Sequence, residues 1–329
     1  MGLLVDGEWR DQWYDTDGNE GRFVREESQF RHWVTANGEA GPTGDSGFAP
    51  EAGRYHLYVA NACPWSHRAL IFRRLKGLTG HIGLSVVNTY MGENGWTFAP
   101  GRGVIADPIH NADYMHQVYT AAKSDYSGRV TVPVLWDKQQ QTIVTNESAD
   151  LIRMFNSAFD AVGASAGDYY PADLREQIDT INDVVYRKIN NGVYKAGFAT
   201  SQDAYEEAVL GVFEGLDEME QRLSEQRYLC GDRLTEADWR LFVTLIRFDA
   251  VYVGHFKCNI RRLQDYPNLS NYTRELYQWP GISETVDLTA YKQHYYRSHD
   301  KVNPTGIVPI GPALDLTVPH DRERLPAAE

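Results

Sequence analysis

The chain has 329 residues, of which 42% are hydrophobic and 23% are charged, a balance typical of a globular protein and not of a disordered one. The formal net charge is −13, and only eight of the 32 basic residues are lysines. This charge argues against nucleic acid or an anionic membrane as a partner, because both bind a concentrated positive surface. An acid-rich, lysine-poor composition is also favoured in a salt-adapted cytoplasm.

Targeting signals and a disulfide framework are not expected. No apolar run approaches the roughly 18–20 residues of a membrane span, and residues 1–20 lack a signal-peptide pattern, which predicts a cytoplasmic protein. The three cysteines, Cys63, Cys230 and Cys258, are odd in number and far apart. In a reducing compartment each is either a buried apolar residue or a reactive thiol.

Residues 1–53 have the composition of an extension, with scattered tryptophans and a loop-like stretch rich in glycine, proline and serine at its end. The first strand is expected at 54–60, where apolar and polar residues alternate. A helix is expected from Pro64 to Gly77, because proline suits the first helical turn. Cys63 therefore lies at a strand-to-helix junction.

The next segment continues this α/β pattern to residue 156. A βαβ unit followed by a hairpin and a helix is predicted. Its remaining elements are a strand at 82–89, a helix at 112–123, strands at 130–136 and 142–144, and a helix that opens at 146–148.

From residue 157 to 300 the pattern is helical throughout. Thr235 to Asp238 has the form of a capping box, in which a threonine hydroxyl and a carboxylate three residues later cap one helix. Residues 301–329 form an irregular, proline-containing tail. The predicted helices are 171–191, 202–225, 235–253, 268–278 and 283–290.

Cys63 is the strongest candidate for a catalytic residue. A thiol at a helix N-terminus faces unpaired backbone N–H groups and the positive end of the helix dipole, and both favour the thiolate. The fourth position of a C-x-x-C motif is occupied by Ser66, so the motif contains no resolving thiol. Such a site forms a mixed disulfide with an external small thiol. Cys230 and Cys258 lack a helix-start context and are expected to be structural.

Signals for a bound cofactor are weak. The glycines of residues 101–106 imitate a dinucleotide fingerprint, but no strand precedes them and Pro108 interrupts the helix that should follow. The histidines do not show metal-ligand spacing. Neither a nucleotide nor a metal is therefore expected.

Six motifs are distributed along the chain: Cys63-Pro64-Trp65-Ser66-His67-Arg68, Thr131-Val132-Pro133, Glu147-Ser148, and the segments 190–200, 294–299 and 303–309. Together they resemble the glutathione-transferase superfamily, in particular the glutathionyl-hydroquinone reductases, or Xi-class transferases. The resemblance covers nearly the whole chain and implies a thioredoxin-like domain followed by an all-helical transferase domain. It also implies a homodimer.

The resemblance implies a reaction. Cys63 would attack the sulfur of a glutathionyl-hydroquinone, the hydroquinone would leave, and a second thiol would resolve the mixed disulfide. Val132, before an expected cis Pro133, would pair with the peptide backbone of the thiol. Glu147 and Ser148 would hold its γ-glutamyl ammonium and carboxylate, so that the co-substrate is either glutathione or γ-glutamylcysteine. Trp96 would pack against the bound thiol.

Structural roles are possible for the same residues, since Pro133 can simply start a strand and Ser148 can simply cap a helix.

The 20 tyrosines suit an aromatic, phenolic substrate, because a tyrosine offers a ring face and a proton-donating hydroxyl. Tyr194 and Tyr296 are the candidates for catalysis. Tyr170, Tyr252 and Tyr295 are candidate substrate contacts, and the sequence does not decide which of Tyr295 and Tyr296 faces the site.

Three other functions compete with this reductase. A conjugating transferase is disfavoured, because a protein thiol would form a disulfide with the bound peptide rather than activate it. A dehydroascorbate or thiol-transferase reductase would use the same cysteine. A docking module without activity has little reason to combine a helix-start Cys-Pro with a Glu-Ser pair.

Overall fold

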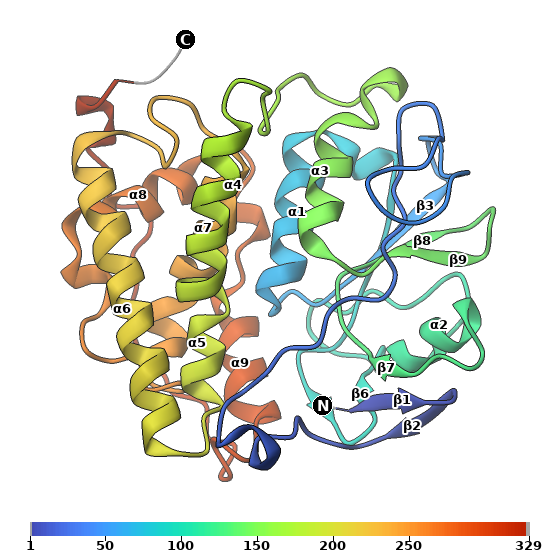
Figure 1. Ribbon diagram of the computed structural model, residues 1–329, viewed down its shortest axis with the longest axis horizontal. Coiled ribbons are helices and arrows are strands. Elements are labelled where there is room, and N and C mark those ends of the chain that lie inside the picture. Colours follow the sequence, from blue (N-terminus) through green and yellow to red (C-terminus); the bar gives the residue numbers. More distant parts are fainter. Residues whose placement is uncertain (1, 327–329) are drawn as a thin grey trace. The chain divides into compact units, whose positions relative to one another are not determined.

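The computed structural model describes residues 2–326, and these divide into two compact units (Figure 1). The first, here called the sheet unit, comprises the described residues up to Trp13 together with Glu26–Gly167. The second, the helical unit, comprises Tyr14–Arg25 and the described residues from Asp168 onward. The segment 1–53, predicted as an extension, is thus divided between the two units rather than standing apart.

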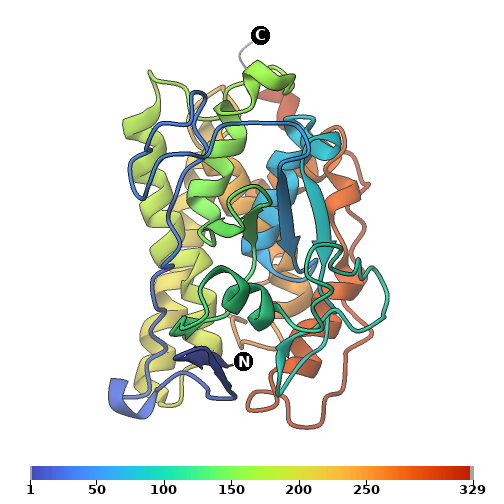
Figure 2. The same ribbon diagram turned by 90° about the vertical axis from the view of Figure 1, so that its right-hand side faces the viewer.

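A four-stranded sheet forms the centre of the sheet unit, in the order β4-β3-β8-β9 (Figure 2). Strands β3 and β4 are parallel, whereas β8 runs antiparallel to both β3 and β9. All five residues of β3 are buried, as expected for a central strand that is covered on both faces. The strands are β3 (Tyr55–Val59), β4 (Gly83–Val86), β8 (Val134–Asp137) and β9 (Thr142–Thr145).

The register of the central pair brings two loops to the same end of the sheet. Tyr58 in β3 is paired with Val134 in β8. Because the two strands are antiparallel, the loop that leaves β3 toward Cys63 lies beside the loop that enters β8 through Pro133. The predicted βαβ unit and hairpin are therefore present, with strands shorter than the sequence pattern suggested.

Helices α1 and α3 lie side by side in the sheet unit (Figure 1). Smaller strands complete this unit: β1, β2 and β7 form a three-stranded sheet, and β5 and β6 form a short hairpin. The sequence pattern predicted none of these smaller strands. Their bounds, with those of the helices, are α1 (Pro64–Leu75), α2 (Met115–Ala122), α3 (Ser148–Ser157), β1 (Leu3–Val5), β2 (Glu8–Arg10), β5 (Met91–Gly92), β6 (Gly95–Trp96) and β7 (Gly128–Arg129).

The extension is attached to the sheet unit by specific contacts. Arg31 forms an ion pair with Asp150 in the first turn of α3, with one N–O distance of 3.0 Å. The indole N–H of Trp9 donates a hydrogen bond to the carbonyl of Glu93, in the β5–β6 turn, at 2.9 Å. Gly95 leaves room for this indole, since a Cβ at that position would lie 2.7 Å from the Trp9 ring.

Four of the five helices that the sequence predicts are present in the helical unit, but two of these four are divided. The expected helix 171–191 divides into α4 and a π-helical turn at Val185–Asn190, and that of 235–253 divides into α7 and a π-helical turn at Phe248–Tyr252. Its helices are α4 (Arg175–Val184), α5 (Gly192–Gly197), α6 (Gln202–Glu225), α7 (Glu236–Arg247), α8 (Pro267–Gln278) and α9 (Leu288–Ser298).

The prediction of a helix at 283–290 was wrong. That segment contains a 3₁₀ turn at Ser283–Thr285, and the last helix, α9, runs from Leu288 to Ser298. The physical reason is the N-cap: the carboxylate of Asp287 accepts a hydrogen bond from the Ala290 N–H at 2.9 Å and starts a new helix. Further 3₁₀ turns are Asp17–Asn19, Leu78–Gly80, Asp160–Val162, Leu263–Asp265 and Arg322–Arg324.

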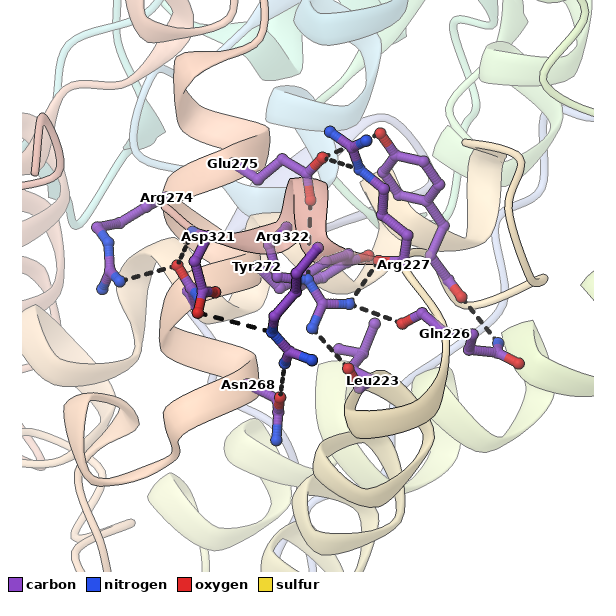
Figure 3. Close-up of polar contacts among 12 residues, drawn as sticks. Leu223, Gln226, Arg227, Asn268, Tyr272, Arg274, Glu275, Asp321 and Arg322 are labelled. Atoms are coloured by element: carbon purple, nitrogen blue, oxygen red, sulfur yellow. Dashed lines mark hydrogen bonds and ion pairs between the residues drawn. The ribbon is translucent and has the colours of Figure 1, made fainter. Parts of the chain in front are cut away.

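The tail is held on the helical unit by Arg322 (Figure 3). This side chain is fully buried and donates hydrogen bonds to the carbonyls of Gln226 and Arg227, each at 2.7 Å, and to that of Leu223. These carbonyls belong to the last turn of α6 and the residues that follow it, where helical partners run out. Among the described residues, none of the helices is both long and apolar enough to span a membrane.

Candidate active site

Cys63 is the N-cap residue of α1, as the sequence predicted. Pro64 occupies the first helical position, and the Cys63 carbonyl accepts the first helical hydrogen bond, from the His67 N–H, at 2.9 Å. The side chain is 9% exposed. A sulfur at this position is close to the free N–H groups of the first turn, which stabilise a negative charge.

The loop before β8 lies against the sulfur. The Cys63 Sγ is 3.5 Å from the carbonyl oxygen of Val132, and the Val132–Pro133 peptide bond is cis. Trp96, at the end of β6, is 6% exposed and belongs to the same buried cluster as Cys63 and Val132. Three of the residues predicted for thiol binding and catalysis are therefore packed together within the sheet unit.

Glu147 and Ser148 lie at the N-terminus of α3. Glu147, rather than Ser148, is the N-cap: its carboxylate accepts the Ala149 N–H at 2.9 Å and the Ser28 hydroxyl at 3.1 Å. The Ser148 hydroxyl accepts a hydrogen bond from Arg68 of α1 at 3.5 Å. A helix N-terminus with an adjacent guanidinium suits a carboxylate ligand.

The other two cysteines are in different surroundings. Cys230 is 4% exposed and Cys258 is fully buried, and burial raises the pKa of each thiol to about 12. The negative charge of Asp238 raises the pKa of Cys230 further. Both thiols are therefore protonated at neutral pH and act as apolar side chains.

Three tyrosines of the helical unit form one hydrogen-bonded cluster, here called the tyrosine trio. The Tyr295 hydroxyl is the central member, bonded to the Tyr194 hydroxyl and, at 3.2 Å, to the Tyr252 hydroxyl. They come from α5, from the π-helical turn after α7 and from α9. Burial raises the pKa of Tyr295 well above its usual value, so this central hydroxyl is protonated at neutral pH.

Aromatic and cationic side chains surround the trio. The Arg25 guanidinium lies 5.1 Å from the centre of the Tyr194 ring and donates to the Asn191 side chain at 3.0 Å. Phe256 stacks on Tyr252 at 5.6 Å. Gly197, in the motif 190–200, must be a glycine, because a Cβ would lie only 2.0 Å from the Phe256 ring.

Tyr296 and Tyr170 lie outside the trio. Tyr296 is partly buried and packs its ring on His255, with centroids 4.7 Å apart. Tyr170 donates to the carboxylate of Asp179 at 2.7 Å and lies under the guanidinium of Arg175. Of the two adjacent tyrosines that the sequence left undecided, Tyr295 is therefore the one that meets Tyr194, and Tyr296 does not share this hydrogen bonding.

Comparison with known proteins agrees with this geometry. The N-terminal and C-terminal domain families of glutathione S-transferases match residues 62–158 and 202–275. The glutathionyl-hydroquinone reductase YqjG of Escherichia coli is 57% identical over 98% of this chain and 99% of its own length. The glutathionyl-hydroquinone reductase PcpF of Sphingobium chlorophenolicum is 58% identical over 96% of this chain and 98% of its own.

Solved structures give the same result. The glutathione-bound structure of the Escherichia coli protein superposes with a TM-score of 0.91, covering 98% of this chain and 99% of that one. A Xi-class transferase from Natrialba magadii, 47% identical, also superposes with a TM-score of 0.91, covering 100% of this chain and 98% of that one. The chain belongs to the glutathionyl-hydroquinone reductases, the Xi class of the glutathione transferases. The predicted fold, a thioredoxin-like domain and a helical transferase domain, is confirmed.

Within this Xi-class chain, sequence reasoning passed over two arginines. Arg68 closes the Cys63 motif and was quoted as part of it, but its contact with Ser148 depends on the packing of α1 against α3. Arg247, at the end of α7, is fully buried and its guanidinium lies 3.7 Å from the centre of the Tyr291 ring. An arginine directly after the largely apolar run 241–246 was the available signal, since arginine is almost never fully buried without a partner.

Proposed function

We propose that this protein reduces glutathionyl-hydroquinones to hydroquinones, with a low-molecular-weight thiol as reductant and Cys63 as nucleophile. The observation that carries the proposal is the position of the Cys63 sulfur at the N-terminus of α1, 3.5 Å from the Val132 carbonyl, in a member of the Xi class. The N-terminus of a helix stabilises a thiolate, and no second cysteine stands in the motif to close a disulfide on it.

In the first half-reaction, the Cys63 thiolate attacks the sulfur of the substrate. A sulfur–sulfur bond forms and the carbon–sulfur bond breaks, and its electron pair stays with the ring carbon of the hydroquinone. That carbon takes a proton, which we assign to the hydroxyl of Tyr194, and the hydroquinone leaves. The products are the free hydroquinone and a mixed disulfide between Cys63 and the small thiol.

In the second half-reaction, another small thiol resolves this mixed disulfide. Its sulfur attacks the substrate-derived sulfur, the disulfide of the two small thiols departs, and the electron pair returns to Cys63 as a thiolate. The proton released by the incoming thiol restores the Tyr194 hydroxyl. Two thiols are thus oxidised to one disulfide as one glutathionyl-hydroquinone is reduced.

The N-terminus of α3 is the proposed binding site for the γ-glutamyl end of the thiol. Glu147 would hold the ammonium group, and Ser148, together with the Arg68 guanidinium, would hold the carboxylate. These contacts concern only the γ-glutamyl residue, so both glutathione and γ-glutamylcysteine would fit. Val132 would supply backbone hydrogen bonds to the cysteinyl residue, and Trp96 would pack against it.

The tyrosine trio is the proposed hydroquinone-binding and proton-donating element. Tyr194 is the proposed proton donor. After the transfer, the Tyr295 hydroxyl would donate a hydrogen bond to the Tyr194 oxygen and the Tyr252 hydroxyl would donate one to Tyr295, so that the negative charge is shared along the trio. Tyr296 and Tyr170, the other two predicted site tyrosines, make their contacts outside the trio.

The decisive experiment is thiol-dependent release of hydroquinone from a glutathionyl-hydroquinone by wild type, Cys63→Ala and Cys230→Ala. We expect no release above background with Cys63→Ala and nearly wild-type release with Cys230→Ala. Mass spectrometry after treatment with glutathione disulfide should show one glutathione adduct, on Cys63. Full activity of Cys63→Ala would exclude the proposed nucleophile, and conjugation of an electrophile without an adduct would favour a conjugating transferase.

We also propose that the protein is a cytoplasmic homodimer, as the Xi-class resemblance implies. Light scattering of the purified protein tests the dimer, and a mass equal to one chain would contradict it.

A further inference from the structure

Arg247 combines a charged group with complete burial next to the trio. It is the last residue of α7 and one of its N–H groups donates to the Val243 carbonyl, one turn earlier, at 2.7 Å. The guanidinium lies over the ring of Tyr291, 3.7 Å from its centre. Tyr291 is four residues before Tyr295 in α9, so both tyrosines lie on the same face of that helix.

The same arginine is also linked to the third member of the trio. The π-helical turn that carries Tyr252 starts at Phe248, directly after Arg247. Arg247 therefore stands where the helices that supply Tyr252 and Tyr295 meet. A full positive charge placed here acts through a water-poor interior, where electrostatic interactions are strong.

Arg247 is coupled electrostatically to Tyr291 and to the three tyrosines of the trio. Burial alone would lower the pKa of Arg247, but the hydroxyls of Tyr291, Tyr252, Tyr295 and Tyr194 raise it. In return, burial raises the pKa of Tyr295, and the Arg247 charge acts in the opposite direction and lowers it. The other titratable groups around Tyr295 are histidines, with His294 at 5.3 Å, His299 at 5.4 Å and His255 at 6.2 Å between ring centres.

We infer that Arg247 is a positioning residue that stabilises the negative charge of the tyrosine trio at the moment when the trio gives its proton to the substrate. This inference rests on the proposed function of the trio as proton donor. Before the transfer the three hydroxyls are neutral, and after it one phenolate is shared along the Tyr194–Tyr295–Tyr252 hydrogen bonds. Arg247 is charged throughout, so it stabilises the state after transfer more than the state before, which is the condition for accelerating a step.

The stacking on Tyr291 gives the arginine a fixed place. A guanidinium that lies on a ring keeps a defined orientation at little further entropic cost. Because Tyr291 and Tyr295 are one helical turn apart, this contact also sets the distance between the charge and the trio. Arg247 touches no reacting atom in this scheme and acts only through the tyrosines.

The test compares Arg247→Gln, Arg247→Lys and the matched control Arg240→Gln. Arg240 lies on the same helix and is also buried, but it pairs with Glu236 at 2.9 Å. We expect Arg247→Gln to lower kcat by roughly 10- to 100-fold with KM changed by less than about threefold. Without the cation the tyrosines are harder to ionise, so the alkaline limb of the kcat–pH profile should move to higher pH.

The lysine variant separates charge from packing. Arg247→Lys keeps the charge and should recover kcat to within about threefold of wild type. Arg240→Gln should lower the unfolding temperature without moving the pH profile. Formation of the glutathione adduct on Cys63 from glutathione disulfide needs no proton from the trio and should be unchanged in Arg247→Gln.

The inference is overturned by a folded Arg247→Gln with wild-type kcat and pH profile in an assay where wild type is active. If the glutamine variant does not fold, a folded lysine variant with kcat as low as Tyr194→Phe overturns it equally. Wild type that releases no hydroquinone would instead refute the proposed function, so the two failures are distinguishable.

Discussion

The Cys63 site and the tyrosine trio are built in different ways. In the sheet unit, the position of the thiol is set by backbone: Cys63 caps the start of α1, and its sulfur lies 3.5 Å from the Val132 carbonyl. In the helical unit, the trio consists of side-chain hydroxyls supplied by three separate helical segments. The first arrangement depends on the start of one helix and the pairing of two strands, and the second on the packing of helices.

The difference has consequences for substitution. A backbone site survives most side-chain changes except that of the sulfur itself, because helix termini and carbonyls remain in place. A side-chain cluster is sensitive to each hydroxyl and to anything that shifts the helices carrying it.

Tyr194→Phe should separate the two half-reactions. We expect a loss of roughly 100-fold or more in hydroquinone release, since a positioned general acid typically contributes 10²–10⁴-fold. Adduct formation on Cys63 from glutathione disulfide should be unchanged, because that exchange involves only the thiol site. Stopped-flow release and mass spectrometry measure the two steps. A parallel loss of both would show that the two sites do not work independently.

Arg322→Ala should destabilise the helical unit. Its loss leaves the carbonyls of Leu223, Gln226 and Arg227 without their buried donor, which should cost about 2–4 kcal/mol of unfolding free energy. The exposed neighbour Arg324 is the control, and Arg324→Ala should change stability by less than about 0.5 kcal/mol. Urea unfolding measures both. Equal, small effects would mean that the tail contributes nothing to the stability of α6.

Tyr295→Phe and Tyr296→Phe test which tyrosine belongs to the site. We expect Tyr295→Phe to lower kcat by roughly 10-fold or more, since it removes the central hydroxyl of the trio, and Tyr296→Phe by less than about threefold. Steady-state kinetics of the two variants shows which of the two tyrosines belongs to the site. The reverse order would assign the proton donor network to Tyr296.

Ser148→Ala should raise KM for the thiol by roughly 5- to 10-fold with little change in kcat, as expected for loss of one hydrogen bond to a charged group. Ser157→Ala, at the other end of α3, is the matched control, because its hydroxyl only bonds to the Arg153 carbonyl. An unchanged KM in Ser148→Ala would place the γ-glutamyl carboxylate elsewhere.

Acidification should weaken the helical unit through His255 and His299. Their ring nitrogens are 3.1 Å apart, and burial lowers the pKa of His255 from 6.5 to about 3 and that of His299 well below its usual value. The unfolded chain therefore binds protons that the folded one does not. Stability should fall as the pH drops below 6.5 toward 3, by up to about 1.4 kcal/mol per pH unit for each histidine.

Urea unfolding at a series of pH values checks this slope. His255→Asn should be less stable at neutral pH but should show a shallower dependence on pH. A slope equal to that of wild type would mean that His255 does not carry the effect.

Particular residues show which features of the fold and the site could be predicted from the sequence. The strand-to-helix junction at Cys63 and the helix at 202–225 were predictable, because each depends on residues close together in the chain. The cis peptide before Pro133 was expected only from the family resemblance. The start of α9 at Leu288 was missed, since it depends on the Asp287 cap within a stretch that has helical character on both sides. The choice between Tyr295 and Tyr296 was open, because neighbouring residues in a helix point about 100° apart and only its packing selects one.

Short motifs were sufficient to predict the family, the strand-to-helix position of Cys63 and the order of the main elements, because such motifs encode turns, caps and helix starts. Tertiary structure alone decided that Tyr194, Tyr252 and Tyr295 share hydrogen bonds, that Arg68 reaches Ser148, and that Arg247 lies under Tyr291. These contacts join residues far apart in the chain. Their distances depend on how whole helices pack, which no local pattern of residues records.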